Sequence, residues 1–209
     1  AHSGLWNAIG QRIDQYLVER VGIAALGVRA VRREYFETYG TTLNGLRALH
    51  SVDPQEYLDF VHDLPLEDYV QPNPALDAML KRLPVDKVIF TNADAPHAQR
   101  VMDRLGIAHH FQTVIDIQAL AYANKPEPRA YQFVLDQLGA QGRECFLVED
   151  APRNLQPARL LGMLTVLVSP VPVNVRMARV DYVIADILDL EAALARSGQL
   201  APPALPRTE

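Results

Sequence analysis

The chain of 209 residues has little cysteine, no excess of positive charge and no long apolar run. Because Cys145 is its only cysteine, no disulfide framework is possible within the chain. The formal net charge of −5 is the opposite of what a nucleic-acid interface requires, so we expect no nucleic-acid partner. No run approaches the roughly 20 apolar residues of a membrane-spanning helix, and no signal peptide opens the sequence. These absences predict a cytoplasmic protein without a membrane partner, and we expect a monomer or a homodimer.

Hydrophobic residues nevertheless make up 49% of the chain, which is enough to build a sizeable core. In the first half, the apolar residues recur at the spacing of a helix, beginning with Leu5, Ile9, Ile13, Tyr16 and Leu17. We predict a second helix over about residues 23–39, which a glycine ends. Two further helices should start at residues 53–54 and 73–74, where an Asp or Asn precedes a proline.

From residue 86 onward, short apolar runs alternate with amphipathic stretches. The apolar runs predict strands at residues 87–91, 113–117, 145–148, 165–168 and 182–184. The stretches between them predict helices at residues 95–105, 128–138 and 152–161, each followed by a glycine. This alternation is typical of an α/β fold with a Rossmann-like parallel sheet that is covered on both faces. We therefore predict an α-helical unit over 1–74, an α/β core over 75–196 and a proline-rich tail over 197–209.

Polar residues follow three successive strands of the predicted sheet, at the edge where open parallel sheets bind ligands. Thr91 and Asn92 end the first strand, and Lys125 lies in the loop after the second. Glu149 and Asp150 follow the third. A hydroxyl, amide donors, an ammonium and two carboxylates together suit a phosphate bound with Mg²⁺, which prefers hard oxygen ligands.

Each of these residues also has an ordinary structural explanation. Thr91 and Asn92 are typical of a strand end that leads into a helix cap. Lys125 is typical of a solvated loop, and Glu149 and Asp150 of capping acids at a helix N-terminus. The shared position at one sheet edge favours the joint phosphate-binding role over these separate explanations.

The three strand ends resemble motifs II, III and IV of the haloacid dehalogenase superfamily. The resemblance implies that the hydroxyl of Thr91 binds phosphate and that Lys125 contacts both the phosphate and the nucleophile. It also implies that Asn92 adds a hydrogen-bond donor at the phosphate. These three residues are our predicted phosphate-binding set, and Thr91 and Lys125 our predicted catalytic residues.

The same resemblance implies Mg²⁺ as the cofactor. Asp150 is then the direct metal ligand, and Glu149 acts beside it or through a water molecule. Asn154, on the following helix, supports the loop that carries them. A dehalogenase on the same scaffold would need no Mg²⁺, so the presence of Glu149 and Asp150 argues against that activity.

Four segments are similar to the bacterial pyrimidine 5′-nucleotidase-like group of that superfamily: YGTTLNGL at residues 39–46, FVHDLPL at 60–66, FTNAD at 90–94, and VED at 148–150 with RNL at 153–155. In that group the helical half, here 1–74, is a cap that covers the active site. The likeness implies that His62, Asp63 and Arg47 contact the substrate. The ordinary alternative is that His62 and Asp63 are a helix C-terminal histidine and a turn residue.

The resemblance also implies a nucleophile that we do not find. In the family, a central strand ends in Asp-x-Asp-x-Thr; its first Asp attacks phosphorus and its second acts as general acid and base. No such motif occurs in the 209 residues, so we expect an upstream extension. Its length should be roughly 10–20 residues, which is the length of one strand and the loop that follows it. That strand should lie between those at 87–91 and 145–148. We expect the 209 residues alone to be inactive.

Together these features predict a HAD-type phosphatase that hydrolyses a small phosphomonoester through an aspartyl phosphate. The subgroup resemblance implies a nucleoside 5′-monophosphate, with a pyrimidine base, as substrate. Two alternatives stay open: a catalytically inactive HAD-like module that binds phosphate or a protein, and a phosphosugar phosphatase on the same scaffold.

Overall fold

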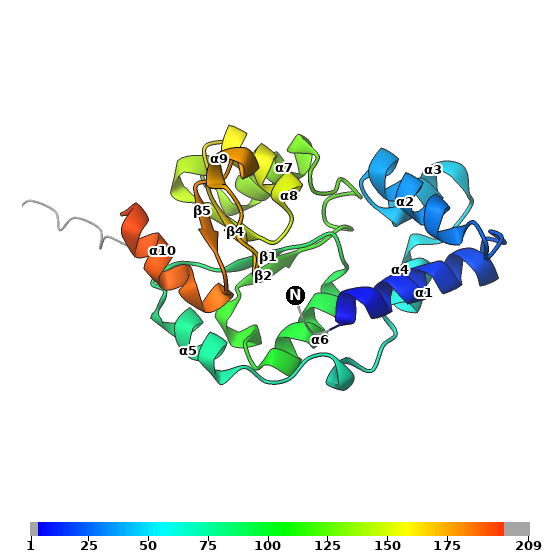
Figure 1. Cartoon of the computed structure of the whole chain (residues 1–209), viewed down its shortest axis with the longest axis horizontal. Helices are drawn as coiled ribbons and strands as arrows, with labels where there is room; N and C mark the ends of the chain where they lie inside the picture. Colours follow the sequence, from blue (N-terminus) through cyan, green and yellow to red (C-terminus); the bar gives the residue numbers. More distant parts are fainter. Residues whose placement is uncertain (1–3, 199–209) are drawn as a thin grey trace, which may run out of the picture.

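The computed structural model describes residues 4–198 (Figure 1). In this range the α-helices are α1 (Leu5–Glu19), α2 (Val28–Tyr39), α3 (Thr42–Leu49), α4 (Pro54–His62), α5 (Pro74–Arg82), α6 (Ala95–Leu105), α7 (Pro128–Leu138), α8 (Pro152–Leu160), α9 (Val175–Ala178) and α10 (Leu190–Ser197). The strands are β1 (Val88–Phe90), β2 (Thr113–Ile115), β3 (Phe146–Glu149), β4 (Leu164–Val168) and β5 (Tyr182–Ile184). Short 3-10 turns are η1 (Leu66–Asp68), η2 (Ala108–His110), η3 (Gly142–Glu144) and η4 (Ile187–Asp189). The predicted tail at 197–209 lies outside the described residues from position 199 onward.

Helices α1–α4, which we call the helical unit, pack around an apolar cluster of their own and lie to one side of the strands (Figure 1). The helix pairs α1 and α4, and α2 and α3, lie against each other. Tyr16, Leu17 and Leu46 are almost fully buried in this cluster. The Tyr16 hydroxyl donates a hydrogen bond to Glu56 at 2.6 Å, which satisfies its polar end as burial requires. Among residues 4–198, no helix combines the length and the apolarity needed to cross a bilayer.

The predicted second helix begins five residues later than we expected, at Val28 instead of Ile23. The chain turns after α1 instead, because Gly22 adopts φ +83°, a left-handed conformation that glycine adopts without strain. The amide of Ile23 then donates back to the carbonyl of Leu17 at 2.9 Å. The helix ends at Gly40, as predicted, with φ +80°.

The strand half of the chain confirms the predicted α/β fold. Every strand pairing is parallel, β1 with β2 and β3 with β4 with β5. The predicted strands match the observed ones within two residues at each end. Helices α6 and α7 have the predicted bounds, and each stops at a glycine with positive φ, Gly106 and Gly139. Glycine favours this left-handed position because it has no Cβ to clash with the last turn.

The strands form two separate ladders: over residues 4–198, no backbone pairing joins β1 to β3. Their side chains nevertheless share the same apolar clusters. Ile89 and Val148 contribute to one cluster, and Phe90 and Leu147 to another. All residues of β1 and β3 are only half-buried, whereas Val166 in β4 is fully buried. The two ladders therefore lie edge towards edge in one core, and the facing edges are less covered than the rest.

Gly142 provides a test of this packing. A Cβ at this position would overlap the carbonyl oxygen of Leu161, which is backbone and has little room to move. We expect Gly142→Ala to lower the free energy of unfolding by about 1–3 kcal/mol, the usual effect of forcing extra atoms into a packed site. Chemical denaturation monitored by circular dichroism measures this. The control is Gly27→Ala, because the nearest atom to an added Cβ there is 3.8 Å away. Equal midpoints for the two variants would contradict the expectation.

Candidate phosphate and metal site

Lys125 brings the ends of the two ladders together. Its ammonium donates to the carbonyl of Phe90 at the end of β1 at 2.9 Å, and to Glu149 Oε2 at the end of β3 at 2.6 Å. The Lys125 residue is only 9% exposed, so this ion pair is shielded from water. A buried ammonium needs such a partner, because without one its desolvation would favour the neutral form. Three loops that are distant in sequence thus meet at the carboxyl edge of the strands, as predicted.

Asn92 holds the backbone of Lys125 from both sides. Its side-chain NH₂ donates to the Lys125 carbonyl at 3.0 Å, and its side-chain oxygen accepts from the Lys125 amide at 2.8 Å. We had expected Asn92 to donate to phosphate. In the structure both hydrogen-bonding ends of its side chain contact the loop from which the ammonium extends.

Thr91 follows β1 directly and remains in the parallel ladder, with its amide donating to Ile115 at 3.0 Å. Its side-chain oxygen accepts a hydrogen bond from the amide of Ala93 at 3.0 Å. A hydroxyl that accepts in this way still has its own proton to donate. Thr91 therefore offers a donor at the strand end, next to the residue whose carbonyl binds Lys125.

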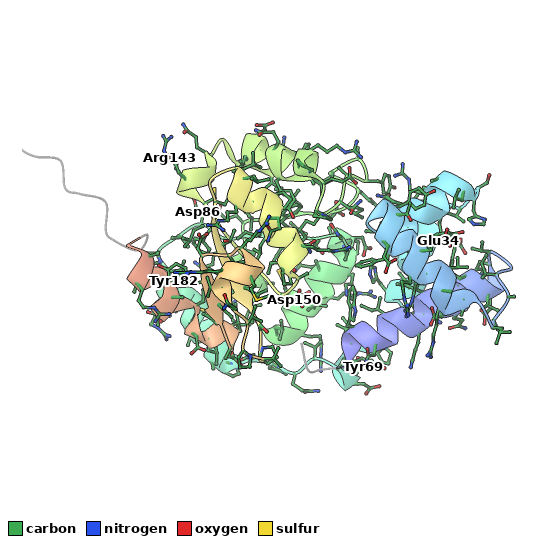
Figure 2. The ribbon with its side chains drawn as sticks, turned by 45° about the horizontal axis from the view of Figure 1, so that its top comes forward. Glu34, Tyr69, Asp86, Arg143, Asp150 and Tyr182 are labelled. Atoms are coloured by element: carbon green, nitrogen blue, oxygen red, sulfur yellow. The ribbon has the colours of Figure 1, made fainter. Side chains whose placement is uncertain are left out.

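Glu149 and Asp150 have opposite titration behaviour. Burial alone would raise the pKa of Glu149, but the Lys125 ammonium and local hydrogen bonds outweigh it and hold the pKa below its usual range. The hydrogen bond with Glu149 and burial raise the pKa of Asp150. The two shifts differ in sign because the Lys125 ammonium binds Glu149 directly, whereas Asp150 lies next to the Glu149 carboxylate. Figure 2 shows Asp150 in the middle of the molecule, between the strands and the helical unit.

The residues of this edge fit a bound Mg²⁺. Glu149 and Asp150 offer carboxylate oxygens, the ligand type that Mg²⁺ prefers. Asn154, in the first turn of α8, holds its main-chain oxygen against the hydroxyl of Tyr131. Its side-chain Oδ1 is buried and has no hydrogen-bond partner among residues 4–198. A buried acceptor without a partner is costly, and a bound cation with its waters would supply one.

Comparison with known proteins decides the family. The family described as haloacid dehalogenase-like hydrolase matches residues 3–162, well over half of the chain. The chain belongs to this family. It is a haloacid dehalogenase-like hydrolase, and its predicted motifs all lie within the matched residues.

Two relatives illustrate how far the likeness extends. Fructose-1-phosphate phosphatase YqaB of Escherichia coli (strain K12) is 29% identical over 152 residues, which cover 73% of this chain and 68% of that protein. Bifunctional epoxide hydrolase 2 of Rattus norvegicus is 42% identical over 62 residues, which are 30% of this chain and 11% of that protein. The chain thus matches only a small part of the epoxide hydrolase.

Solved structures share the fold. A HAD phosphatase from Thermococcus onnurineus has a TM-score of 0.62 at 19% identity, over 91% of this chain and 90% of that one. L-2-haloacid dehalogenase from Xanthobacter autotrophicus has a TM-score of 0.55 at 20% identity, over 92% of this chain and 85% of that one. At these identities the likeness shows the haloacid dehalogenase-like fold, which serves both reactions.

The predicted substrate-contacting residues of this haloacid dehalogenase-like hydrolase line two different clefts. Arg47 lines a cleft of about 610 Å³ that also includes Pro126, the residue after Lys125. Its guanidinium lies 3.8 Å from the centre of the Tyr122 ring. His62 and Asp63 line another cleft, of about 590 Å³. The structure therefore does not bring the three residues together.

His62 connects the helical unit to α6. Its Nδ1 lies 2.6 Å from a carboxylate oxygen of Asp94, and its ring stacks on that of His97 with the ring centres 4.0 Å apart. The carbonyl of His62 accepts from Arg100 at 2.8 Å. His62, Asp94 and His97 are all nearly buried. We expected His62 at the substrate, but its observed contacts are those of a buried junction between α4 and α6.

Two residues without a predicted role join the helical unit to the site. Arg153, three residues after Asp150, donates to the carbonyl of Gly40 at 3.3 Å. Asn124, which precedes Lys125, donates to the carbonyl of Tyr39 at 3.2 Å. A Cβ on Gly40 would overlap the Asn124 side chain, so this segment needs glycine for space as well as for its positive φ. The one sign of this role in the sequence was that Arg153 lies close to Asp150, and Asn124 next to Lys125.

The buried His97 predicts a loss of stability in mild acid. Burial, together with neighbouring His62, lowers the pKa of His97 from 6.5 to about 4. Between these values the unfolded chain binds a proton that the folded protein excludes. The free energy of unfolding should therefore fall as pH drops from 6.5 to 4, by up to about 1.4 kcal/mol per pH unit from this group.

Urea denaturation at a series of pH values, on the parent and on His97→Gln, measures this effect. The variant should show a shallower fall between pH 6.5 and 4. Between pH 7 and 9 His97 is neutral in both states, so the two profiles should run parallel there. Identical slopes in the acid range would contradict the assignment.

Proposed function

We propose that this haloacid dehalogenase-like hydrolase hydrolyses phosphomonoesters with Mg²⁺ as its cofactor. The observation that carries the proposal is the buried Lys125 ammonium, held between the carbonyl of Phe90 and the carboxylate of Glu149. A fixed cation at the carboxyl edge of the strands is suited to a phosphoryl group, whose oxygens carry negative charge. Being already in place, it needs little reorganisation when charge develops in the transition state.

The chain's own residues would divide the work as follows. Thr91 donates its hydroxyl proton to one phosphoryl oxygen, and Lys125 donates from its ammonium to another. Asn92 keeps Lys125 in position through its two backbone hydrogen bonds. Asp150 and Glu149 would hold Mg²⁺, with Asn154 beside them. Bound Mg²⁺ supplies additional positive charge at the phosphoryl oxygens.

The proposal assigns the nucleophile to an aspartate in sequence upstream of residue 1. Two aspartates near the strands already accept several hydrogen bonds within the protein, which makes them unsuitable as nucleophiles. Asp116 accepts from the amides of Ala95, Gln118 and Ala119. Asp181 accepts from the amide and the hydroxyl of Thr165. The upstream aspartate would attack phosphorus and release the alcohol, and water would then hydrolyse the aspartyl phosphate.

The arrangement of the strands supports this assignment. β1 and β3 are in separate ladders and only half-buried, although strands in a parallel sheet are normally covered on both faces. A strand inserted between them would pair with both and would end beside Lys125. Its last residue would then lie at the edge where Thr91 and Asp150 lie.

We propose nucleoside 5′-monophosphates, with a pyrimidine base, as the substrate class. The support is the resemblance of segments 39–46, 60–66 and 90–94 to the nucleotidase-like group. The cleft beside Pro126 has a volume of about 610 Å³, within the range of ligand pockets. It contains the ring of Tyr122 and the guanidinium of Arg47, groups that stack on planar ligands.

One observation favours a second candidate, a phosphosugar substrate. The Escherichia coli relative, similar over most of this chain, is named a fructose-1-phosphate phosphatase. Arg47 and Asn44 in the same cleft could equally hydrogen-bond sugar hydroxyls. The two candidate substrates share the phosphoryl chemistry at Lys125. They differ only in the alcohol that is released, which is a nucleoside in one case and a sugar in the other.

Assays of phosphate release distinguish the nucleotide from the phosphosugar as substrate. Protein expressed with its natural upstream sequence should release phosphate from UMP and CMP with Mg²⁺, and the release should stop when EDTA removes the metal. A higher kcat/KM for UMP or CMP than for fructose 1-phosphate supports the nucleotide, and the reverse order supports the phosphosugar. No release from either class, or from a wider phosphomonoester panel, would exclude the proposal.

Replacing Lys125 tests the residue that carries the proposal. We expect Lys125→Met to lower kcat by about 10²–10³-fold, as loss of one preorganised charge-stabilising donor does. The matched control is Lys81→Met, because Lys81 is an exposed lysine on α5. It should retain the parent rate. A Lys125→Met protein that folds and keeps more than about a tenth of the parent kcat would contradict the role.

A further inference from the structure

Asp77, His109 and His110 converge at a place that the proposed reaction does not use. Asp77 lies in the first turn of α5, and both histidines lie in η2. The Nε2 atoms of His110 and His109 lie 2.8 and 3.1 Å from the same carboxylate oxygen, Asp77 Oδ1. The two rings are in contact, with their centres 4.0 Å apart. Two nitrogens and one oxygen from separate segments thus point to one centre.

These spacings are those of hydrogen bonds between imidazole and carboxylate, and they also match the separation of ligands around one metal ion. Zinc binds histidine nitrogen and carboxylate oxygen at about 2.0–2.2 Å. Two such ligands at right angles are about 3 Å apart, and at the tetrahedral angle about 3.4 Å. The observed 2.8 and 3.1 Å are close to the right-angle spacing. A cation would therefore need only small side-chain movements to bind all three.

We propose that Asp77, His109 and His110 form a binding site for a divalent transition metal, with Zn²⁺ as the representative ion. Two imidazoles and one carboxylate suit Zn²⁺, Ni²⁺ or Co²⁺, whereas Mg²⁺ prefers oxygen ligands. The side chain of His109 is 65% exposed and that of Asp77 38% exposed. Solvent therefore reaches the centre, and water completes the coordination.

The site is separate from the proposed phosphate site. The histidines precede β2 and so lie at the amino edge of the strands, whereas Lys125 and Asp150 lie at the carboxyl edge. Figure 2 shows Asp86, at the amino end of β1, on the far side of the strands from Asp150. Metal at one site can therefore be altered without touching the other.

Bound metal would connect α5 to the turn after α6. Leu76 and Met79 of α5 already share an apolar cluster with Ile107, beside η2. A metal bond across the surface of this cluster would stabilise the folded protein, because the unfolded chain has no preformed site. The effect is measurable without any activity of the enzyme.

Calorimetric titration of untagged protein with Zn²⁺, in saturating Mg²⁺, tests the proposal. The experiment is done in an Asp150→Asn background, so that the acidic pair does not contribute a second site. We expect one Zn²⁺ per chain and at least about a tenfold loss of affinity in His109→Asn and in Asp77→Asn. The control is Glu34→Gln, which removes an exposed acid on α2 of the helical unit and should leave binding unchanged (Figure 2).

Thermal unfolding provides a second readout. At a free Zn²⁺ concentration of 100 times the parent Kd, the midpoint should rise by about 5–10 °C in the parent and by no more than about half as much in His109→Asn. His109 is largely exposed, so its replacement should not prevent folding. Equal Zn²⁺ affinity in parent and variants, or absence of binding in the parent, would overturn the proposal.

Discussion

The site depends on one buried ion pair, between Lys125 and Glu149. The ammonium also binds the carbonyl that ends β1, so one side chain holds both ladders at their common edge. Removing either partner would leave an unpaired buried charge, which is far more costly than losing a surface salt bridge. This constraint explains why Asn92 uses its whole amide on the backbone of Lys125: the charge is useful only if its loop does not move.

Local signals in the sequence predicted most of the fold. Glycine after the last helical residue predicted where α6 and α7 end, and an Asp or Asn before proline predicted where α4 and α5 begin. The site followed from topology: parallel strands place their carboxyl ends at one edge, so residues after three strands must meet. The predicted start of the second helix was wrong, because the apolar residues at 23–26 suggest a helix, whereas in the structure the chain turns at Gly22 and again at residues 25–27 before α2 begins.

Side-chain partners could not be predicted in the same way. The sequence gives the residue type of Asn92 and of His62, but their hydrogen-bond partners are 33 and 32 positions away. Which of several polar neighbours each one selects depends on tertiary distances that spacing does not encode. Asp77 and His110 are also 33 positions apart and carry no motif, so their convergence is visible only in the folded chain.

The same loops that form the site also hold the helical unit. Asn124 and Arg153 bind the carbonyls of Tyr39 and Gly40, and each is close in sequence to a residue of the site, Asn124 to Lys125 and Arg153 to Asp150. Any movement of α2 must therefore change the hydrogen bonds of these loops. The junction of His62 with Asp94 reaches the third loop of the site, because Asp94 lies between Thr91 and the start of α6. The contacts of Tyr39 and Gly40 therefore link the end of α2 directly to the loops that carry Lys125 and Asp150.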